Sequence, residues 1–153
     1  EALLRWTTTS GEARVPSEFI PVAEDCGEIL PIGRWVLGEA CRQARRWHEA
    51  GLQFGRIAVN VSAVQLRGSG LPNLLTELLA ETGADPRRIE LEITETVLMQ
   101  NPEHNARVLK KVKALGVGLG GLLAQALRFL LDLHEQFYQS YAHMCQLEMA
   151  FQS

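Results

Sequence analysis

Oxygen-bearing side chains at the ends of three short apolar segments are the residues of this chain best suited to chemistry. Glu92 lies in the apolar–acidic run 88–95, Asn60 ends the apolar run 56–61, and Glu1 leads the apolar start of the chain. Carboxylate and amide oxygens are the hard donors that Mg²⁺ and Mn²⁺ prefer in proteins. These three residues therefore predict a divalent-cation site, provided that the fold brings the segments together.

The run 88–95 has the period of a strand. Apolar and polar side chains alternate, so that three apolar residues share one face and two glutamates share the other. Two carboxylates on one face are costly to bury unless a cation or hydrogen bonds compensate them. The pattern alone leaves two interpretations open, a half-solvated edge strand or a metal site. Taken alone, Glu1 is more typical of a surface terminus than of a metal ligand, and Asn60 is more typical of a turn.

Composition limits the class of protein. A chain of 153 residues with 46% hydrophobic content has enough apolar residues for the core of one domain. The net charge of −3 gives no indication of a large basic surface for a nucleic-acid polymer. No apolar run of about 18 residues predicts a membrane span. Because the first residue is Glu1 and not methionine, we expect a longer parent protein, with upstream sensor or membrane segments.

Three cysteines indicate the compartment. Cys26, Cys41 and Cys145 have no metal-binding spacing, and their odd number is not that of a disulfide framework. We therefore expect a reducing, cytoplasmic environment. A zinc site made by His134, His143 and Cys145 does not fit any standard ligand spacing.

Helical periodicity and turn residues predict the elements that must position these side chains. Residues 7–16 read as a loop, Ser17 as the cap of a short helix, and Gly27 to Pro31 as a turn. Longer helices are expected over the ranges 32–50, 73–81 and 102–115, with strands at 56–61 and 88–95. In the first of these helices, Trp35 and Trp47 are expected on the apolar side. His48 and His104 are expected to face solvent, and Gln65 is assigned no chemistry.

The order of these elements predicts a parallel sheet. Strands that alternate with helices form βαβ units, and right-handed crossovers bring the carboxyl ends of the strands to one edge. Asn60 and Glu92 are therefore expected close together at that edge, where βα barrels place their chemistry.

Five short motifs, in this order, carry a resemblance to a known family. They are Glu1–Trp6 (EALLRW), residues 16–24 (PSEFIPVAE), residues 35–37 (WVL), residues 59–62 (VNVS) and residues 92–95 (EITE). Over residues 1–118 the chain resembles the EAL domains, which hydrolyse cyclic di-GMP. The resemblance implies a modified (β/α) barrel of the TIM type.

The resemblance also implies roles for single residues. Glu1, Asn60 and Glu92 match the family's metal ligands, with Mg²⁺ or Mn²⁺ as the cofactor. Arg5 matches the arginine that contacts the phosphate of cyclic di-GMP, and Glu95 matches the glutamate that steadies the following loop.

The resemblance ends after Gly118. EAL domains continue into an Asp-Asp-Phe-Gly-Thr-Gly segment and a later lysine, whereas here no aspartate follows until Asp132 and no lysine follows Lys113. We therefore expect two parts: residues 1–118, the N-terminal half of an EAL-like barrel with parallel strands, and residues 119–153, a divergent helical tail. The tail is expected to be helical from about Leu122 to Met149, and to cover the sheet or to mediate a homodimer or another partner contact.

These observations lead to one functional expectation and one alternative. The family activity is metal-dependent hydrolysis of cyclic di-GMP to linear pGpG, and this chain, without the Asp-Asp motif and the lysine, is expected to be truncated and inactive. The alternative is a non-catalytic remnant that binds nucleotide or a protein partner.

Overall fold

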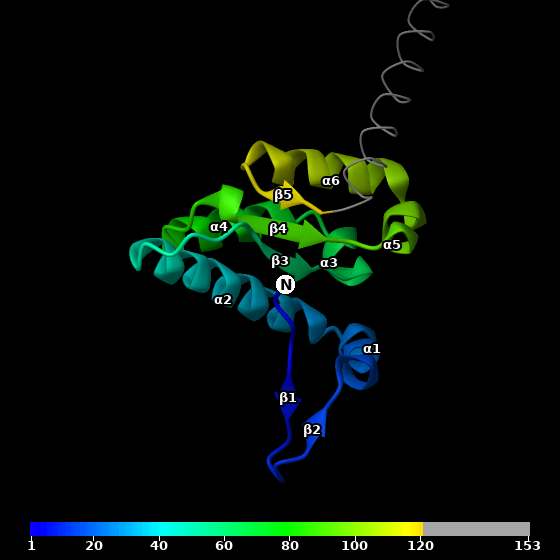
Figure 1. The fold of residues 1–153 in the computed structure, drawn as a ribbon. Helices are drawn as coiled ribbons and strands as arrows, with labels where there is room; N and C mark the ends of the chain where they lie inside the picture. The colour runs from blue at the N-terminus through cyan, green and yellow to red at the C-terminus, as the bar shows by residue number, and fades with distance from the viewer. Residues whose placement is uncertain (121–153) are drawn as a thin grey trace, which may run out of the picture.

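The computed structural model describes residues 1–120 (Figure 1). Its elements, in chain order, are β1 Trp6–Thr7, β2 Ala13–Arg14, α1 Pro16–Cys26, α2 Ile29–Glu49, β3 Ile57–Asn60, α3 Ala63–Arg67, α4 Leu71–Thr82, a 3-10 helix Pro86–Arg88, β4 Ile89–Glu92, α5 Glu95–Gln100, α6 Pro102–Ala114 and β5 Gly118–Leu119.

A parallel sheet forms the centre of the described chain. Its strand order is β3-β4-β5, and both strand pairs are parallel. On the outer side of β3, Ala2 forms a parallel bridge with Val59. The predicted parallel sheet is confirmed, and residues 1–120 form part of a (β/α) barrel without closing it.

The two faces of the sheet differ as the alternation predicts. Ile57, Val59, Ile89 and Leu91 are at most 7% exposed and belong to the main core. That core also holds the apolar sides of α2, α4 and α6, so these helices cover one face. The opposite face carries the polar side chains of β3 and β4. Burial of each large aliphatic side chain stabilises the fold by roughly 1.5–3 kcal/mol.

Small residues let α2 approach the sheet closely. Its buried stripe contains Ala40 and Ala44, whereas Trp35 is 57% exposed and Trp47 is 36% exposed. The prediction that both tryptophans lie on the apolar side was wrong. The small side chains let α2 pack so close to the sheet that an indole does not fit between them. Trp47 packs instead at the margin, edge-to-face on Phe54 with a centroid distance of 5.2 Å.

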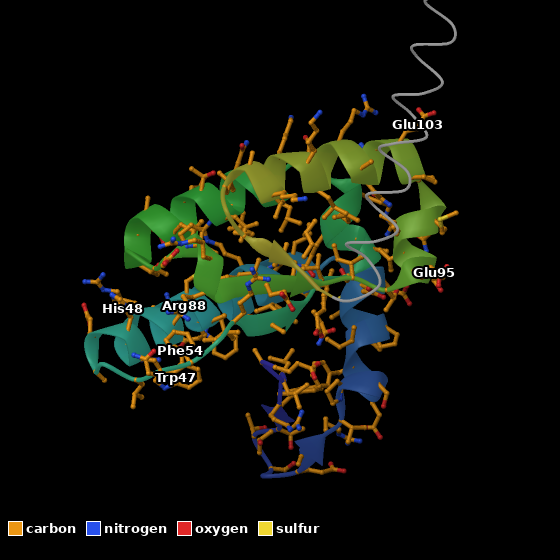
Figure 2. The ribbon with its side chains drawn as sticks, turned by 45° about the horizontal axis from the view of Figure 1, so that its top comes forward. Trp47, His48, Phe54, Arg88, Glu95 and Glu103 are labelled. Carbon is orange, nitrogen blue, oxygen red and sulfur yellow. The ribbon has the colours of Figure 1, made fainter. Side chains whose placement is uncertain are left out.

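Phe54 belongs to a small cluster at the entry to the strands (Figure 2). The Arg88 guanidinium lies 5.1 Å from the centre of the Phe54 ring. It also donates hydrogen bonds to the carbonyl oxygens of Phe54 and Gly55. A cation over an aromatic face contributes about 0.5–2 kcal/mol. The cluster therefore fixes the loop before β3 to the start of β4.

The N-terminal segment differs from the sequence prediction in two places. Residues 7–16 are not a plain loop, because β1 and β2 pair as an antiparallel hairpin. Helix α1 starts at Pro16, with Val15 and not Ser17 at its N-cap. Proline suits the first helical position because its fixed φ is helical and its missing N–H has no intrahelical partner there.

The expected turn between Gly27 and Pro31 is shorter than predicted. Helix α2 already begins at Ile29, so Pro31 lies in its first turn, where a helix does not need the N–H that proline lacks. Pro72 similarly lies at the start of α4, which begins at Leu71, two residues before the predicted start.

Short helices follow both chemically important strands. Ser62 caps α3, as predicted, and Gln65 completes a capping box with it. Thr94 caps α5, a helix of six residues that the sequence pattern did not reveal. Such caps satisfy backbone N–H groups that a helix start leaves without partners.

The expected helical tail, from about Leu122 to Met149, lies outside the described residues, as do its expected partner contacts. Within residues 1–120, no helix combines the length and the apolar character that crossing a membrane requires.

Candidate functional site

Asn60 and Glu92 lie side by side at the carboxyl ends of two adjacent strands. They are direct partners in the register of β3 and β4, and the backbone N–H of Val61 donates to the Glu92 carbonyl oxygen at 2.9 Å. Both side chains line a cavity of about 380 Å³. The prediction that these two residues meet at one edge of the sheet is confirmed.

Glu1 joins this pair through Asn60. The Nδ2 of Asn60 donates a hydrogen bond to Glu1 Oε1 at 2.8 Å. The backbone holds Glu1 in place, because the N–H of Ala2 donates to the Ala58 carbonyl oxygen at 2.8 Å. The three predicted donors therefore come from three neighbouring segments of one sheet.

The donor set suits a hard divalent cation. Glu1 and Glu92 supply carboxylate oxygens, and the Oδ1 of Asn60 is not used in its bond to Glu1. Oxygen donors of this kind fit Mg²⁺ or Mn²⁺. Within residues 1–120, no three His, Cys, Asp or Glu side chains gather as a potential metal cluster. Two carboxylates and one amide oxygen match the cation in the type of donor, and residues 1–120 place no larger cluster of ligands around them.

Gln65 supports the cavity from its wall, a role that the sequence did not suggest. Its Oε1 accepts a hydrogen bond from the Ser62 backbone N–H at 3.1 Å, and the residue is 9% exposed. Because α3 begins just after Asn60, this capping box fixes the backbone next to a predicted ligand. Gly33 of α2 permits the arrangement, since a methyl group there would lie 2.0 Å from Gln65 Nε2.

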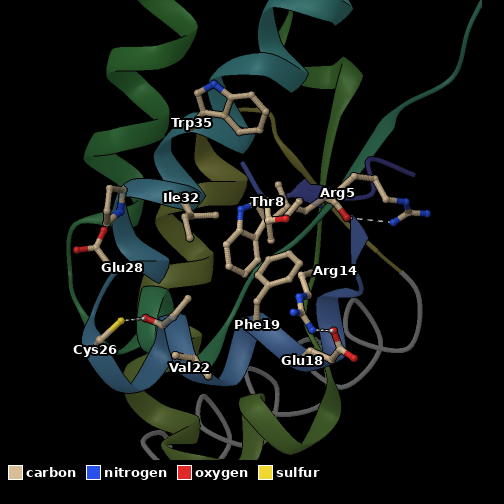
Figure 3. Close-up of a pocket in the computed structure, with 14 residues that line it drawn as sticks. Arg5, Thr8, Arg14, Glu18, Phe19, Val22, Cys26, Glu28, Ile32 and Trp35 are labelled. Atoms are coloured by element: carbon tan, nitrogen blue, oxygen red, sulfur yellow. Dashed lines mark hydrogen bonds and ion pairs between the residues drawn. The ribbon is translucent and has the colours of Figure 1, made fainter. Parts of the chain in front are cut away.

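Arg5 lies in different surroundings. It lines an apolar cavity of about 1110 Å³ between the hairpin and helices α1 and α2, together with Trp6, Phe19 and Trp35 (Figure 3). Its Nη1 donates to the Leu4 carbonyl oxygen at 3.0 Å. Arg5 does not line the cavity that holds Asn60 and Glu92, but it lines a smaller cavity together with Glu1.

Glu95 and His104 lie on the two helices that follow β4. Glu95 is exposed in the first turn of α5, where the helix dipole favours a carboxylate (Figure 2). Among residues 1–120 its side chain has no hydrogen-bond partner, and its loop-stabilising role stays a prediction. His104 is half-buried, with its Nε2 3.2 Å from the Leu66 carbonyl oxygen. The expectation that His104 faces solvent was wrong, because α6 packs beside α3.

The turn that leads into β4 contains a carboxylate with a shifted pKa. Asp85 caps the 3-10 helix by accepting from the backbone N–H of Arg87 at 3.0 Å. The Arg87 guanidinium also bonds both carboxylate oxygens. These contacts lower the pKa of Asp85, since they stabilise its charged form. These contacts tie together the turn that leads into β4.

Comparisons with known proteins point to one family. A family model described as the EAL domain matches residues 1–120. The signaling protein YkoW of Bacillus subtilis (strain 168) is 41% identical over 117 residues, which cover 76% of this chain and 14% of YkoW. The bifunctional diguanylate cyclase/cyclic di-GMP phosphodiesterase MucR of Pseudomonas aeruginosa is 40% identical over 119 residues, which cover 78% of this chain and 17% of MucR.

A solved structure agrees with the sequence comparisons. The PaMucR phosphodiesterase in its c-di-GMP complex superposes with a TM-score of 0.73 and 38% identity. The match covers 76% of this chain and 47% of the MucR chain in that structure. The present chain thus spans about a sixth of these two curated relatives and about half of the solved domain. With the family model matching residues 1–120, the chain belongs to the EAL domain family.

Proposed function

We propose that residues 1–120 form the cation-binding part of a cyclic di-GMP site, whose family reaction is metal-dependent hydrolysis to linear pGpG. The observation that carries this proposal is the junction of three oxygen donors. Asn60 pairs in register with Glu92 and bonds Glu1 at 2.8 Å. Asn60 and Glu92 end two adjacent parallel strands, and the bridge between Ala2 and Val59 brings Glu1 beside them.

The relatives support the choice of substrate. MucR is named as a cyclic di-GMP phosphodiesterase, and the solved PaMucR domain is a complex with c-di-GMP. Both matches cover more than three quarters of this chain, and the family model spans residues 1–120, which include all three donors. The proposal includes a cytoplasmic location, which the free thiols of Cys26 and Cys41 support.

Each residue has a defined part in the proposed site. Glu1, Asn60 and Glu92 would hold the cation through their side-chain oxygens. A bound Mg²⁺ or Mn²⁺ supplies activation of a water and neutralisation of phosphoryl charge. Arg5 is exposed, and most of its five N–H donors remain available for a non-bridging phosphate oxygen. Because Arg5 lines another cavity, it has to turn toward the sheet edge to reach a bound phosphate.

Hydrolysis needs more groups than these residues provide. The resemblance assigns two further carboxylates and a lysine to the segment after Gly118, where this chain has no aspartate before Asp132 and no lysine at all. Catalytic groups of this kind act as a unit, so the loss of several costs orders of magnitude in rate. We propose that these 153 residues bind cyclic di-GMP with a divalent cation but do not turn it over at a meaningful rate.

The test combines a binding and a turnover assay on the 153-residue chain. Calorimetry with cyclic di-GMP, with and without Mn²⁺, is expected to show cation-dependent binding that Glu92→Ala removes. Chromatography after incubation with Mn²⁺ is expected to show no pGpG. Turnover that Glu92→Ala abolishes would refute the proposed inactivity. An absence of cation-dependent binding would refute the site itself.

A further inference from the structure

Glu90 is a second carboxylate on the polar face of β4. It lies two residues before Glu92, so both side chains project from the same face of the strand. The Glu90 side chain is 22% exposed, and its Oε2 accepts a hydrogen bond from Arg56 Nη1 at 2.9 Å. Unlike Glu92, Glu90 is thus committed to a cation of the protein itself.

Arg56 is fixed at the other side of this contact. Its Nε donates to the Arg87 carbonyl oxygen at 3.3 Å, so the side chain is held by two different groups. A methyl group at Gly118 would lie 3.0 Å from Arg56 Nη1. Gly118 therefore lets the Arg56 side chain pack closely against β5 on its way to Glu90.

Gly120, which directly follows β5, packs against the side chains of both glutamates. A methyl group at Gly120 would lie 3.1 Å from Glu92 Cγ and 3.2 Å from Glu90 Oε1. These two side-chain atoms consequently lie no farther apart than the sum of those distances. If Glu90 did not pair with Arg56, Glu92 would be the next carboxylate on this face with which the Arg56 guanidinium could pair.

We propose that Glu90 is a positioning residue for the cation site. By pairing with Arg56, Glu90 keeps the guanidinium near the start of β4. The Glu92 carboxylate at the end of β4 thereby stays free for the cation. Without Glu90, the guanidinium pairs with Glu92, since an arginine and a carboxylate form strong two-point hydrogen bonds. This inference rests on the proposed function, because it requires Glu92 to bind a cation.

The first experiment measures Mn²⁺ affinity by electron paramagnetic resonance on the 153-residue chain. Glu90→Gln is expected to weaken Mn²⁺ binding about tenfold, the lower end of what loss of a supporting contact costs a metal site. Glu103→Gln, which removes the same charge from the exposed start of α6, is the matched control and is expected to stay within about twofold. Unchanged affinity in Glu90→Gln would overturn the proposal.

A second set of variants separates positioning from a simple loss of negative charge. Arg56→Gln alone is expected to retain or raise the Mn²⁺ affinity, and Arg56→Gln with Glu90→Gln is expected to restore it. In Glu90→Gln, the ¹⁵N–H signal of the Arg56 side chain should show a guanidinium protected from hydrogen exchange with solvent. This protection should be lost when Glu92→Gln is added. An Arg56 signal that is already unprotected in Glu90→Gln would overturn the proposal, as would weaker binding in Arg56→Gln.

The same experiments distinguish this inference from the proposed function. If Glu92→Gln alone leaves Mn²⁺ binding unchanged, the proposed function fails. If Glu92→Gln weakens binding while Glu90→Gln does not, only the positioning role fails. Thermal unfolding of each variant confirms that the protein used in the titration is folded.

Discussion

Replacing Gly33 by alanine should destabilise the fold through the cavity wall beside Asn60. The new methyl group would lie 2.0 Å from Gln65 Nε2 and 2.7 Å from Gln65 Cδ. The Gln65 side chain is buried and holds the Ser62 backbone N–H, so it has to leave its place in the capping box. The substitution therefore acts on the start of α3, directly after a predicted ligand.

Three effects set the size of the change. Alanine in a helix interior is more favourable than glycine by about 1 kcal/mol. Against this, overpacking of a filled site costs about 1–3 kcal/mol, and loss of the hydrogen bond to the Gln65 amide costs about 1 kcal/mol. The balance predicts that Gly33→Ala lowers the free energy of unfolding by about 1–3 kcal/mol.

Urea unfolding measures this difference, and α2 offers a matched control. A methyl group at Gly38 would lie 3.2 Å from the movable end of Arg42 and 3.4 Å from Leu78 Cδ2. Gly38→Ala is therefore expected to be neutral or to stabilise by up to about 1 kcal/mol. Adding Gln65→Ala to Gly33→Ala should recover about 1 kcal/mol or more in a double-mutant cycle.

Equal stability of the Gly33→Ala and Gly38→Ala proteins would refute this reasoning. A coupling energy near zero between positions 33 and 65 would do the same, because it would show that the two side chains do not compete for one space.

Two further predictions follow from shifted pKa values. Burial raises the pKa of the Cys41 thiol to about 11, so iodoacetamide at pH 8 should leave Cys41 unmodified in the folded protein while it alkylates the exposed Cys26. Peptide mass mapping measures the labelling of each cysteine. Equal labelling of both would contradict the packing of α2. Contacts with Arg87 lower the pKa of Asp85 in the folded state, so Asp85 stabilises the fold above its unfolded pKa of about 3.9, and this contribution is lost as the pH falls through the lowered value. The stability advantage over Asp85→Asn should be less than about 1 kcal/mol, because the side chain is 34% exposed. In acid-unfolding curves it should shrink progressively as the pH falls below about 4. An advantage that grows toward lower pH would contradict this sign.

The sequence predicted the central sheet because its alternation is strong. Apolar residues at every second position of 57–61 and 89–93 determine which face is buried, and this places Asn60 and Glu92 at one edge. The hairpin of β1 and β2 was missed, since strands of two residues are too short for any period. Helix α5 was missed for the same reason.

The candidate site was predictable where oxygen donors end the strands, and less so where contacts span the sheet. Gln65 carries no sequence signal of its own beyond its place three residues after Ser62, the spacing of a capping box. The ion pair of Arg56 and Glu90 joins residues 34 positions apart, and it depends on glycines at 118 and 120 that a sequence reading takes as loop formers. Such contacts follow from three-dimensional register, which local patterns do not determine.

The most direct test of the central claim is a Mn²⁺ titration of the 153-residue chain, followed by electron paramagnetic resonance. Glu92→Gln is expected to weaken Mn²⁺ binding by tenfold or more, since it removes one of only two carboxylates in the donor set. The Glu103→Gln protein should bind as the unaltered chain does. Equal Mn²⁺ affinity in the Glu92→Gln and Glu103→Gln proteins would contradict a cation site at the ends of β3 and β4.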